Sequence, residues 1–296
     1  MEFLRPATWD EALALKAEHP AAVPIAGGTD VMVELNFDRR RPPALLDLNR
    51  VAELSRWESD GAVVRLGASV PYARIVAELS GPLPGLALAA RTVGSPQIRN
   101  RGSVGGNLGA ASPAGDAHPP LLAAGRGVRV EAASVRGTRL IPIDAFYLGV
   151  KRNALEPDEL VRAVRIPVAD GPQQFSKIGT RNAMVIAVCA FALALHPRDG
   201  TVGTGLGSAA PTPRRAPEAE EYLAGELAGR GLWESGGGLD GAVVARFGEL
   251  VAAAASPIDD VRGSADYRRH ALAVMARRTL GWCWSAYAGQ REGSAV

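Results

Sequence analysis

Residues 97–116 carry five glycines, two arginines, two serines and two asparagines within one short segment. The segment has neither a helical nor a strand period, so we expect a loop whose backbone is used for chemistry. Gly105 and Gly106 are adjacent, which permits positive φ and lets a ligand approach backbone N–H groups closely. Such a loop suits a phosphate group. The alternative is a pair of tight turns, which a lone Gly-Gly would favour.

A second glycine pair lies upstream, between a short buried strand expected at 23–26 and a helix expected over 31–35. Thr29 is the expected N-cap of that helix. The free N–H groups near Gly27 and Gly28, together with the positive end of the helix dipole, would attract an anion. Two loops of this type can hold the two halves of a diphosphate, and a diphosphate points to a dinucleotide.

Further polar residues near the second loop can complete such a site. Asp116 follows the glycines by ten residues and can accept a hydrogen bond from a ribose hydroxyl, or it can cap the helix expected from Pro119. Ser103 and Asn107 flank the glycines and can donate to phosphate oxygens. The four histidines stand apart from any serine or cysteine nucleophile pattern, so we expect neither hydrolase chemistry nor a catalytic residue. His118 is expected to hydrogen-bond to backbone.

Length and composition restrict the other classes of function. The chain has 296 residues, 47% of them hydrophobic, which is enough for two or three packed units. A net charge of +2 without a basic stripe gives no case for nucleic acid. Cys189 and Cys283 are isolated, so we expect no iron–sulfur cluster and no metal on this chain. Without a signal peptide or a membrane-spanning run, we expect a cytoplasmic protein with no membrane insertion.

Local signals place these loops between helices and strands. Thr8 and Glu11 form a capping box that opens a helix to about Glu18. A helix capped by Ser69 is expected after a strand at 63–68, and an alanine-rich helix, 86–93, leads into the second glycine loop. Strands are expected at 44–48, 128–131, 140–143 and 160–166. Residues 170–172 read as a turn at a domain boundary.

The second unit begins at about Gln173 with strands expected over 184–195 and 201–208, joined by a hairpin. Residues 205–210 fit the G-x-G-x-x-A dinucleotide fingerprint, but Pro211 and Pro213 exclude the helix that this motif requires. Helices follow over 218–228, 239–255 and 265–287. The last helix carries a stripe that we assign to the core: Leu272, Met275, Ala276 and Thr279.

In order and spacing, these motifs resemble those of the FAD-binding medium subunits of the molybdenum hydroxylases, which include xanthine dehydrogenase and carbon monoxide dehydrogenase. The resemblance covers nearly the whole chain, through residues 26–30, 96–100, 103–107, 111–116, 177–181 and 209–213. It implies an α+β fold. A two-lobed FAD-binding domain of the PCMH type would span 1–170, with lobes of about 1–57 and 58–170, and a C-terminal domain, 171–296, would hold a three-stranded antiparallel sheet with helices.

The resemblance also implies that FAD binds noncovalently. The cofactor-binding residues that it assigns are Ala26, Gly27, Gly28, Thr29, Asp30, Val31, Ser103, Gly105, Gly106, Asn107, Asp116, Val161, Lys177 and Arg181. Lys177 and Arg181 would lie at the flavin, where a cation stabilises the negative charge that develops on reduction. Val161 would contact the adenine side through its backbone. Val185 stands where relatives commonly have aspartate, a departure that bears on redox tuning rather than on binding.

By the same resemblance, electrons would enter the FAD from iron–sulfur clusters on a partner subunit and leave to NAD or another acceptor. Molybdenum-pterin and the substrate would belong to a large partner subunit. Thr29, Asp30 and the Ser103 motif look closer to bacterial xanthine dehydrogenase than to carbon monoxide dehydrogenase. The alternatives are the medium subunit of carbon monoxide dehydrogenase or of another aromatic or heterocycle hydroxylase. A non-catalytic nucleotide-binding or scaffolding protein is the alternative from another class.

Overall fold

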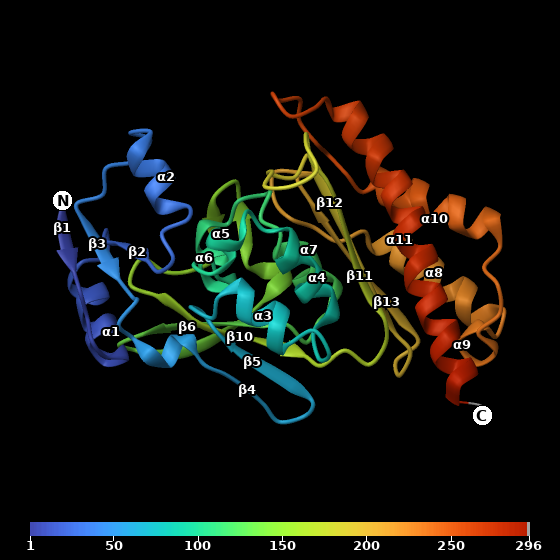
Figure 1. Ribbon diagram of the computed structural model, residues 1–296, viewed down its shortest axis with the longest axis horizontal. Helices are drawn as coiled ribbons and strands as arrows, with labels where there is room; N and C mark the ends of the chain where they lie inside the picture. The colour runs from blue at the N-terminus through green and yellow to red at the C-terminus, as the bar shows by residue number, and fades with distance from the viewer. Residues whose placement is uncertain (295–296) are drawn as a thin grey trace.

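The computed structural model describes residues 1–294, arranged as three successive bodies from the N-terminal to the C-terminal end (Figure 1). The first is a parallel three-stranded sheet of order β1-β3-β2. Its elements are β1 (Glu2–Leu4), α1 (Trp9–Glu18), β2 (Val23–Ile25), α2 (Val31–Asn36) and β3 (Ala44–Asp47). Helix α1 begins as predicted, because the Thr8 side chain accepts from the Glu11 N–H and the Glu11 carboxylate accepts from the Thr8 N–H.

The second body is an antiparallel five-stranded sheet of order β4-β5-β10-β6-β7. Its strands are β4 (Trp57–Ser59), β5 (Val63–Gly67), β6 (Arg129–Ser134), β7 (Gly137–Pro142) and β10 (Leu160–Pro167). The hairpin β8 (Tyr147–Gly149) and β9 (Arg152–Asn153) stands apart from it. The first two bodies share one continuous hydrophobic core, in which Leu46 of β3 and Leu66 of β5 are both buried.

Five helices connect β5 to β6. They are α3 (Tyr72–Glu78), α4 (Pro84–Thr92), α5 (Pro96–Arg99), α6 (Val104–Ala110) and α7 (His118–Ala123). The predicted cap at Ser69 is wrong, since α3 begins three residues later, after Pro71. Pro71 is held in extended backbone by a bridge to Ser103, and the Tyr72 N–H donates to the Gly102 carbonyl, so the chain cannot turn into a helix earlier.

The third body is the antiparallel sheet β11-β12-β13, covered on one side by helices (Figure 1). Its elements are β11 (Gln173–Ile178), β12 (Cys189–His196), β13 (Thr201–Gly207), α8 (Pro217–Gly229), α9 (Leu232–Ser235), α10 (Gly241–Ala253) and α11 (Ala265–Ser294). The strand predicted over 184–195 begins only at Cys189, because Met184 has φ +52°. The stripe of Leu272, Met275, Ala276 and Thr279 is buried, as predicted.

Glycines on one face of β13 let α7 lie directly on this sheet. A Cβ atom at Gly203 would lie 2.0 Å from the carbonyl oxygen of Ala123, and one at Gly205 would lie 2.0 Å from that of Pro119. The segment that fits the dinucleotide fingerprint, 205–210, therefore serves to pack β13 against α7. This contact fixes α7, and with it the loop that carries Asp116, against the third body.

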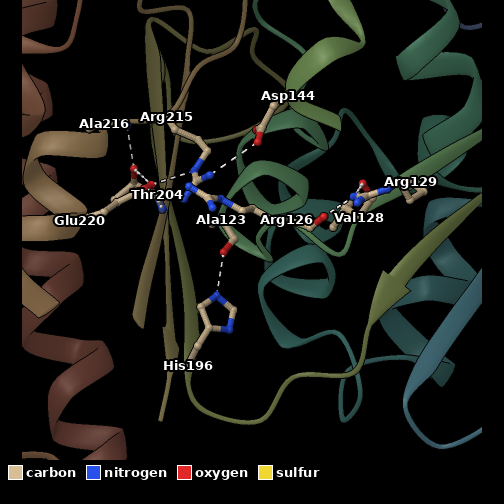
Figure 2. A network of polar contacts seen from close by, with 10 residues as sticks. All are labelled: Ala123, Arg126, Val128, Arg129, Asp144, His196, Thr204, Arg215, Ala216 and Glu220. Atoms are coloured by element: carbon tan, nitrogen blue, oxygen red, sulfur yellow. Dashed lines mark hydrogen bonds and ion pairs between the residues drawn. The ribbon is translucent and has the colours of Figure 1, made fainter. Parts of the chain in front are cut away.

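Side chains reinforce the same junction (Figure 2). Glu220 is buried and accepts from Thr204 and Arg215, and Arg215 also reaches Asp144, just after β7, at 3.5 Å. His196 lies 3.1 Å from the Ala123 carbonyl oxygen at the end of α7. The positions of β12 and β13 relative to α7 are thus determined by several independent contacts.

Replacing Gly205 by alanine is expected to lower the free energy of unfolding by about 1–3 kcal/mol, because the new Cβ must push α7 off the sheet. Gly225→Ala in α8 is the matched control. That glycine is exposed, and a Cβ there would meet no atom within 4 Å, so helix propensity predicts unchanged or slightly higher stability. Urea unfolding measures both variants. Equal stability of Gly205→Ala and the parent would contradict the tight contact between α7 and β13.

Candidate functional site

The first glycine pair lies in a run of unpaired backbone donors between β2 and α2. Within the described part of the chain, the amide nitrogens of residues 27–31 donate no hydrogen bond. Gly28 has φ +73°, a conformation that side-chain-bearing residues rarely adopt. Residues 26–29 are partly buried. Successive free N–H groups in such a turn form a concavity that suits an anion, and the loop therefore fits a phosphate group.

The cap of α2 differs from the prediction. Asp30, rather than Thr29, occupies the N-cap position, and its side chain makes no capping hydrogen bond. The Met32 N–H already donates to the Gly28 carbonyl at 3.1 Å, which tightens the turn before the helix. The prediction of a Thr29 cap is wrong. Because the Asp30 side chain makes no capping hydrogen bond, it leaves the N–H groups at the start of α2 free.

The second glycine pair has a different geometry, because both residues are part of helix α6. The Gly105 N–H donates to the Ala68 carbonyl and the Gly106 N–H donates to Ser103 Oγ, each at 3.1 Å. Neither glycine has positive φ. The prediction that this pair presents free N–H groups is therefore wrong. Gly105 lets α6 approach Ala68, whereas Gly106 is exposed and leaves the outer face of α6 without a side chain.

The two glycine segments touch each other at the turn that precedes α6. A Cβ at Gly27 would lie 1.9 Å from the carbonyl oxygen of Arg101, so only glycine allows this approach. The Arg101 guanidinium lies across the junction, 2.8 Å from Asn49 Oδ1 and 3.4 Å from the Ala26 carbonyl. Sequence reasoning missed Arg101 and Asn49 as site residues. The position of Arg101 just before the Ser103 motif was a signal, whereas nothing in the sequence pointed to Asn49.

Asp116 and Lys177 form one buried ion pair. Lys177 Nζ lies 2.7 Å from Asp116 Oδ2, and the two side chains are 7% and 10% exposed. Burial raises the pKa of Asp116 to about 6, although the neighbouring Lys177 ammonium opposes the shift. Asp116 Oδ1 is buried without a partner in the described structure. A buried carboxylate oxygen of this kind fits the hydroxyl of a ribose or ribityl chain, which would satisfy it.

Three further polar residues, one of them next but one to Asp116 in sequence, form a group near it, and none was predicted as a site residue. Tyr147 Oη lies 2.9 Å from His118 Nδ1, and His118 Nε2 and Tyr72 Oη have no partner among the described residues. Burial lowers the pKa of His118 to about 3, so its ring is neutral. Burial, and then the nearby Asp116 charge, raise the pKa of Tyr72. A backbone partner was expected for His118, whereas the hydrogen-bond partner found at its ring is the Tyr147 side chain.

A pocket of about 430 Å³ opens beside Lys177, between the end of α4 and the loop that follows β11. Its lining includes Arg91, Arg99 and Arg181. Arg181 donates to the carbonyl groups of Ala183 and Met184, so its guanidinium faces its own loop. Arg99 donates to the carbonyls that end α4. The pocket is therefore rich in arginine, but two of its guanidinium groups are partly occupied.

The predicted residues form a connected strip with one exception. Asn107 Oδ1 accepts from the Ala117 N–H at 3.2 Å, which joins the second glycine loop to the turn of Asp116, and Asp116 joins Lys177. Val161 lies apart in β10, 9% exposed, beside a bulge in its pairing with β6. Free N–H groups, a glycine-lined junction and a buried carboxylate with a free oxygen are the parts that a dinucleotide site requires.

Fold and site thus define a two-domain α+β protein with a candidate dinucleotide site. Residues 1–169 match the family described as "FAD binding domain in molybdopterin dehydrogenase", and residues 174–283 match "CO dehydrogenase flavoprotein C-terminal domain". The chain belongs to the family of FAD-binding subunits of the molybdenum hydroxylases. The resemblance, the fold class and the FAD cofactor predicted from the sequence are confirmed, and the protein is an oxidoreductase subunit.

Individual relatives agree with this membership. The chain is 34% identical over 237 residues to the nicotinate dehydrogenase FAD-subunit of Eubacterium barkeri, covering 76% of this chain and 79% of that protein. It is 28% identical to the xanthine dehydrogenase FAD-binding subunit of Escherichia coli O157:H7, covering 97% of each. The solved carbon monoxide dehydrogenase from Hydrogenophaga pseudoflava, which lacks the Mo-pyranopterin moiety, superposes with a TM-score of 0.87 at 28% identity, over 97% of this chain and 98% of that one.

No helix within residues 1–294 combines the length and the apolar character needed to cross a lipid bilayer.

Proposed function

We propose that FAD lies along the strip that begins at Gly28 and ends at Arg181. The diphosphate takes the five free N–H groups of residues 27–31 at the junction of the two glycine loops, and the bare face of α6 at Gly106 lets it approach. Asp116 Oδ1 accepts from a hydroxyl of the cofactor. The observation that carries this assignment is the run of unpaired donors, because no other acceptor in the described structure serves them.

At the flavin end, the residues of this chain hold and orient rather than react. Lys177 holds its ammonium against the Asp116 carboxylate and the Thr92 carbonyl, so it orients that carboxylate, and its positive charge is balanced within the pair. Arg181 borders the same pocket from the loop that follows β11. When bound there, FAD supplies the capacity to take up electrons singly or in pairs. The Arg181 guanidinium contacts carbonyl groups rather than a carboxylate, and a positive charge of this kind near the flavin favours its reduced, more negative state.

The chain acts as an electron relay within a larger enzyme. An iron–sulfur partner subunit delivers electrons to this chain, a large molybdenum-binding subunit oxidises the substrate, and NAD or another acceptor takes the electrons away. Membership of the family supports this arrangement, since its name ties the FAD domain to a molybdopterin dehydrogenase. We also propose a domain boundary near residue 170, with the FAD-binding part before it and the C-terminal part, to residue 296, after it.

For the whole enzyme we propose a heteroaromatic hydroxylase of the xanthine dehydrogenase type. The relatives that act on nicotinate and xanthine, both nitrogen heterocycles, support this class. The similarity to carbon monoxide dehydrogenase keeps carbon monoxide as the second candidate substrate. The substrate pocket would lie on the large partner subunit, so assays of the assembled enzyme decide between these candidates.

The relay is tested by purifying the chain alone with FAD and adding hypoxanthine, xanthine or carbon monoxide without oxygen. We expect one FAD per chain, with an oxidised flavin spectrum that none of these compounds bleaches. Dithionite must bleach it, as the control that the flavin is redox-active. Addition of the two partner subunits is expected to allow bleaching by the true substrate. Bleaching by substrate without the partners would contradict the relay, and a chain that binds no FAD would contradict the site.

A further inference from the structure

Arg101 carries a positive charge that nothing in the described structure neutralises. Its guanidinium contacts two neutral acceptors, Asn49 Oδ1 at 2.8 Å and the Ala26 carbonyl at 3.4 Å, and forms no ion pair with any carboxylate within the described residues. Many other arginines of the chain do pair with carboxylates, as Arg65 does with Glu131. An arginine with neutral partners keeps its full charge and several free N–H donors for a ligand.

The orientation of this guanidinium is fixed by a short chain of hydrogen bonds. Asp47, at the end of β3, is buried and accepts from both the backbone N–H and the side-chain Nδ2 of Asn49, at 3.1 and 2.5 Å. Because Nδ2 is committed to Asp47, the carboxamide oxygen of Asn49 must face outward, where it meets Arg101. These hydrogen bonds hold the exposed guanidinium of Arg101 against the end of the parallel sheet.

That place is the junction of the two glycine loops. The Arg101 backbone contacts Gly27, and its side chain reaches the carbonyl of Ala26, immediately before the run of free N–H groups. A cation and a set of unpaired N–H donors at one point both attract an anion, and neither has one among the described residues. A planar guanidinium can donate two parallel hydrogen bonds to a phosphate, which a lysine in the same place cannot do.

We propose that Arg101 binds the diphosphate of the dinucleotide and that Asn49 is its positioning residue. The inference rests on the proposed FAD site and adds to it a residue that joins the two lobes. The Arg101 backbone and its neighbouring loop belong to the second lobe, whereas Asn49 and Ala26 belong to the first. Occupation of the site by a diphosphate thus ties the lobes together through one side chain.

The test uses the full chain freed of flavin and compares FAD, ADP and riboflavin as ligands. Arg101→Gln is expected to weaken FAD and ADP binding by roughly 10- to 100-fold, as for loss of a charged hydrogen bond, and to leave riboflavin, which has no phosphate, unchanged. Arg101→Lys should recover part of the loss. Arg50→Gln removes a neighbouring exposed arginine and is expected to change nothing. The dependence of FAD binding on salt should be weaker in Arg101→Gln than in the parent.

The outcomes separate this inference from the proposed function. Unchanged FAD and ADP binding by Arg101→Gln would overturn the role of Arg101 while leaving the FAD site intact. Equal weakening of riboflavin and FAD would also overturn it, because it would mean that Arg101 only keeps the lobes in place. If the chain binds ADP through Arg101 but does not bind FAD, the proposed function is overturned, and the role of Arg101 in binding a diphosphate stands. A parent chain that binds neither FAD nor ADP would overturn both the proposed function and the role of Arg101.

Discussion

Gly28→Val is expected to lose its FAD during purification, whereas the parent chain retains it. Gly28 has φ +73°, so a branched side chain strains the turn, and its Cβ would lie 3.3 Å from Met32 Cγ. Rotation of the turn would remove two or three N–H groups from the proposed phosphate site. A loss of about 3 kcal/mol in binding corresponds to about 100-fold weaker affinity. Flavin absorbance per chain and the dissociation constant of FAD measure the effect.

Gly61→Val is the matched control for the strain alone. Gly61 has φ +90° in the turn between β4 and β5, and a Cβ there would meet nothing within 4 Å. The two variants should lose similar conformational stability, but only Gly28→Val should lose FAD. Stoichiometric flavin in Gly28→Val would show that the first loop does not hold the diphosphate.

Lys177→Met is expected to lower the free energy of unfolding at pH 8 by about 3–5 kcal/mol, because it leaves the carboxyl of Asp116 buried without its cation. The pKa of Asp116, about 6 in the folded chain, lies above its ordinary value. This group therefore stabilises the fold more at low pH, and its contribution falls as pH rises through 6. Loss of Lys177 raises that pKa further, so the deficit of the variant should shrink as pH falls toward 5.

Urea unfolding at pH 5 and pH 8 measures this dependence. Lys151→Met removes a more exposed ion pair, with Glu34, and should cost less than about 1 kcal/mol at either pH. The double variant with Asp116→Asn should recover part of the stability at pH 8, since the buried charge is gone. A deficit that is the same at both pH values would indicate lost packing instead of an unpaired charge.

Local features of the fold were predictable from the sequence because their causes are local. The capping box of Thr8 and Glu11 lies within four residues and gave the start of α1 correctly. The glycines of β13 were rightly separated from a dinucleotide fingerprint, since Pro211 and Pro213 exclude a helix at that point. The family motifs, taken in order, predicted both domains and the cofactor class, because each motif has its own constraint and few sequences satisfy all of them.

Features that depend on long-range contacts were not predictable in the same way. The N–H groups of Gly105 and Gly106 were expected to be free, but the Gly105 N–H donates to the carbonyl of Ala68, at the end of a strand that is distant in the sequence. Asp116 and Lys177 were assigned to different parts of the cofactor, and only the folded chain brings them within 2.7 Å. Met184 looked like strand because it lies in an apolar run, and its positive φ results from a loop that folds back on itself.

The salt bridge between Asp116 and Lys177 has a consequence for the order of folding events. Asp116 lies before residue 169 and Lys177 lies in β11, so the pair joins two units that have separate hydrophobic cores. Each core can condense by itself, but this part of the site exists only after the two units have docked through α7 and β13. Refolding should therefore proceed through a state with native secondary structure and no capacity for flavin. Once docking limits the rate, cofactor uptake from excess FAD becomes independent of FAD concentration.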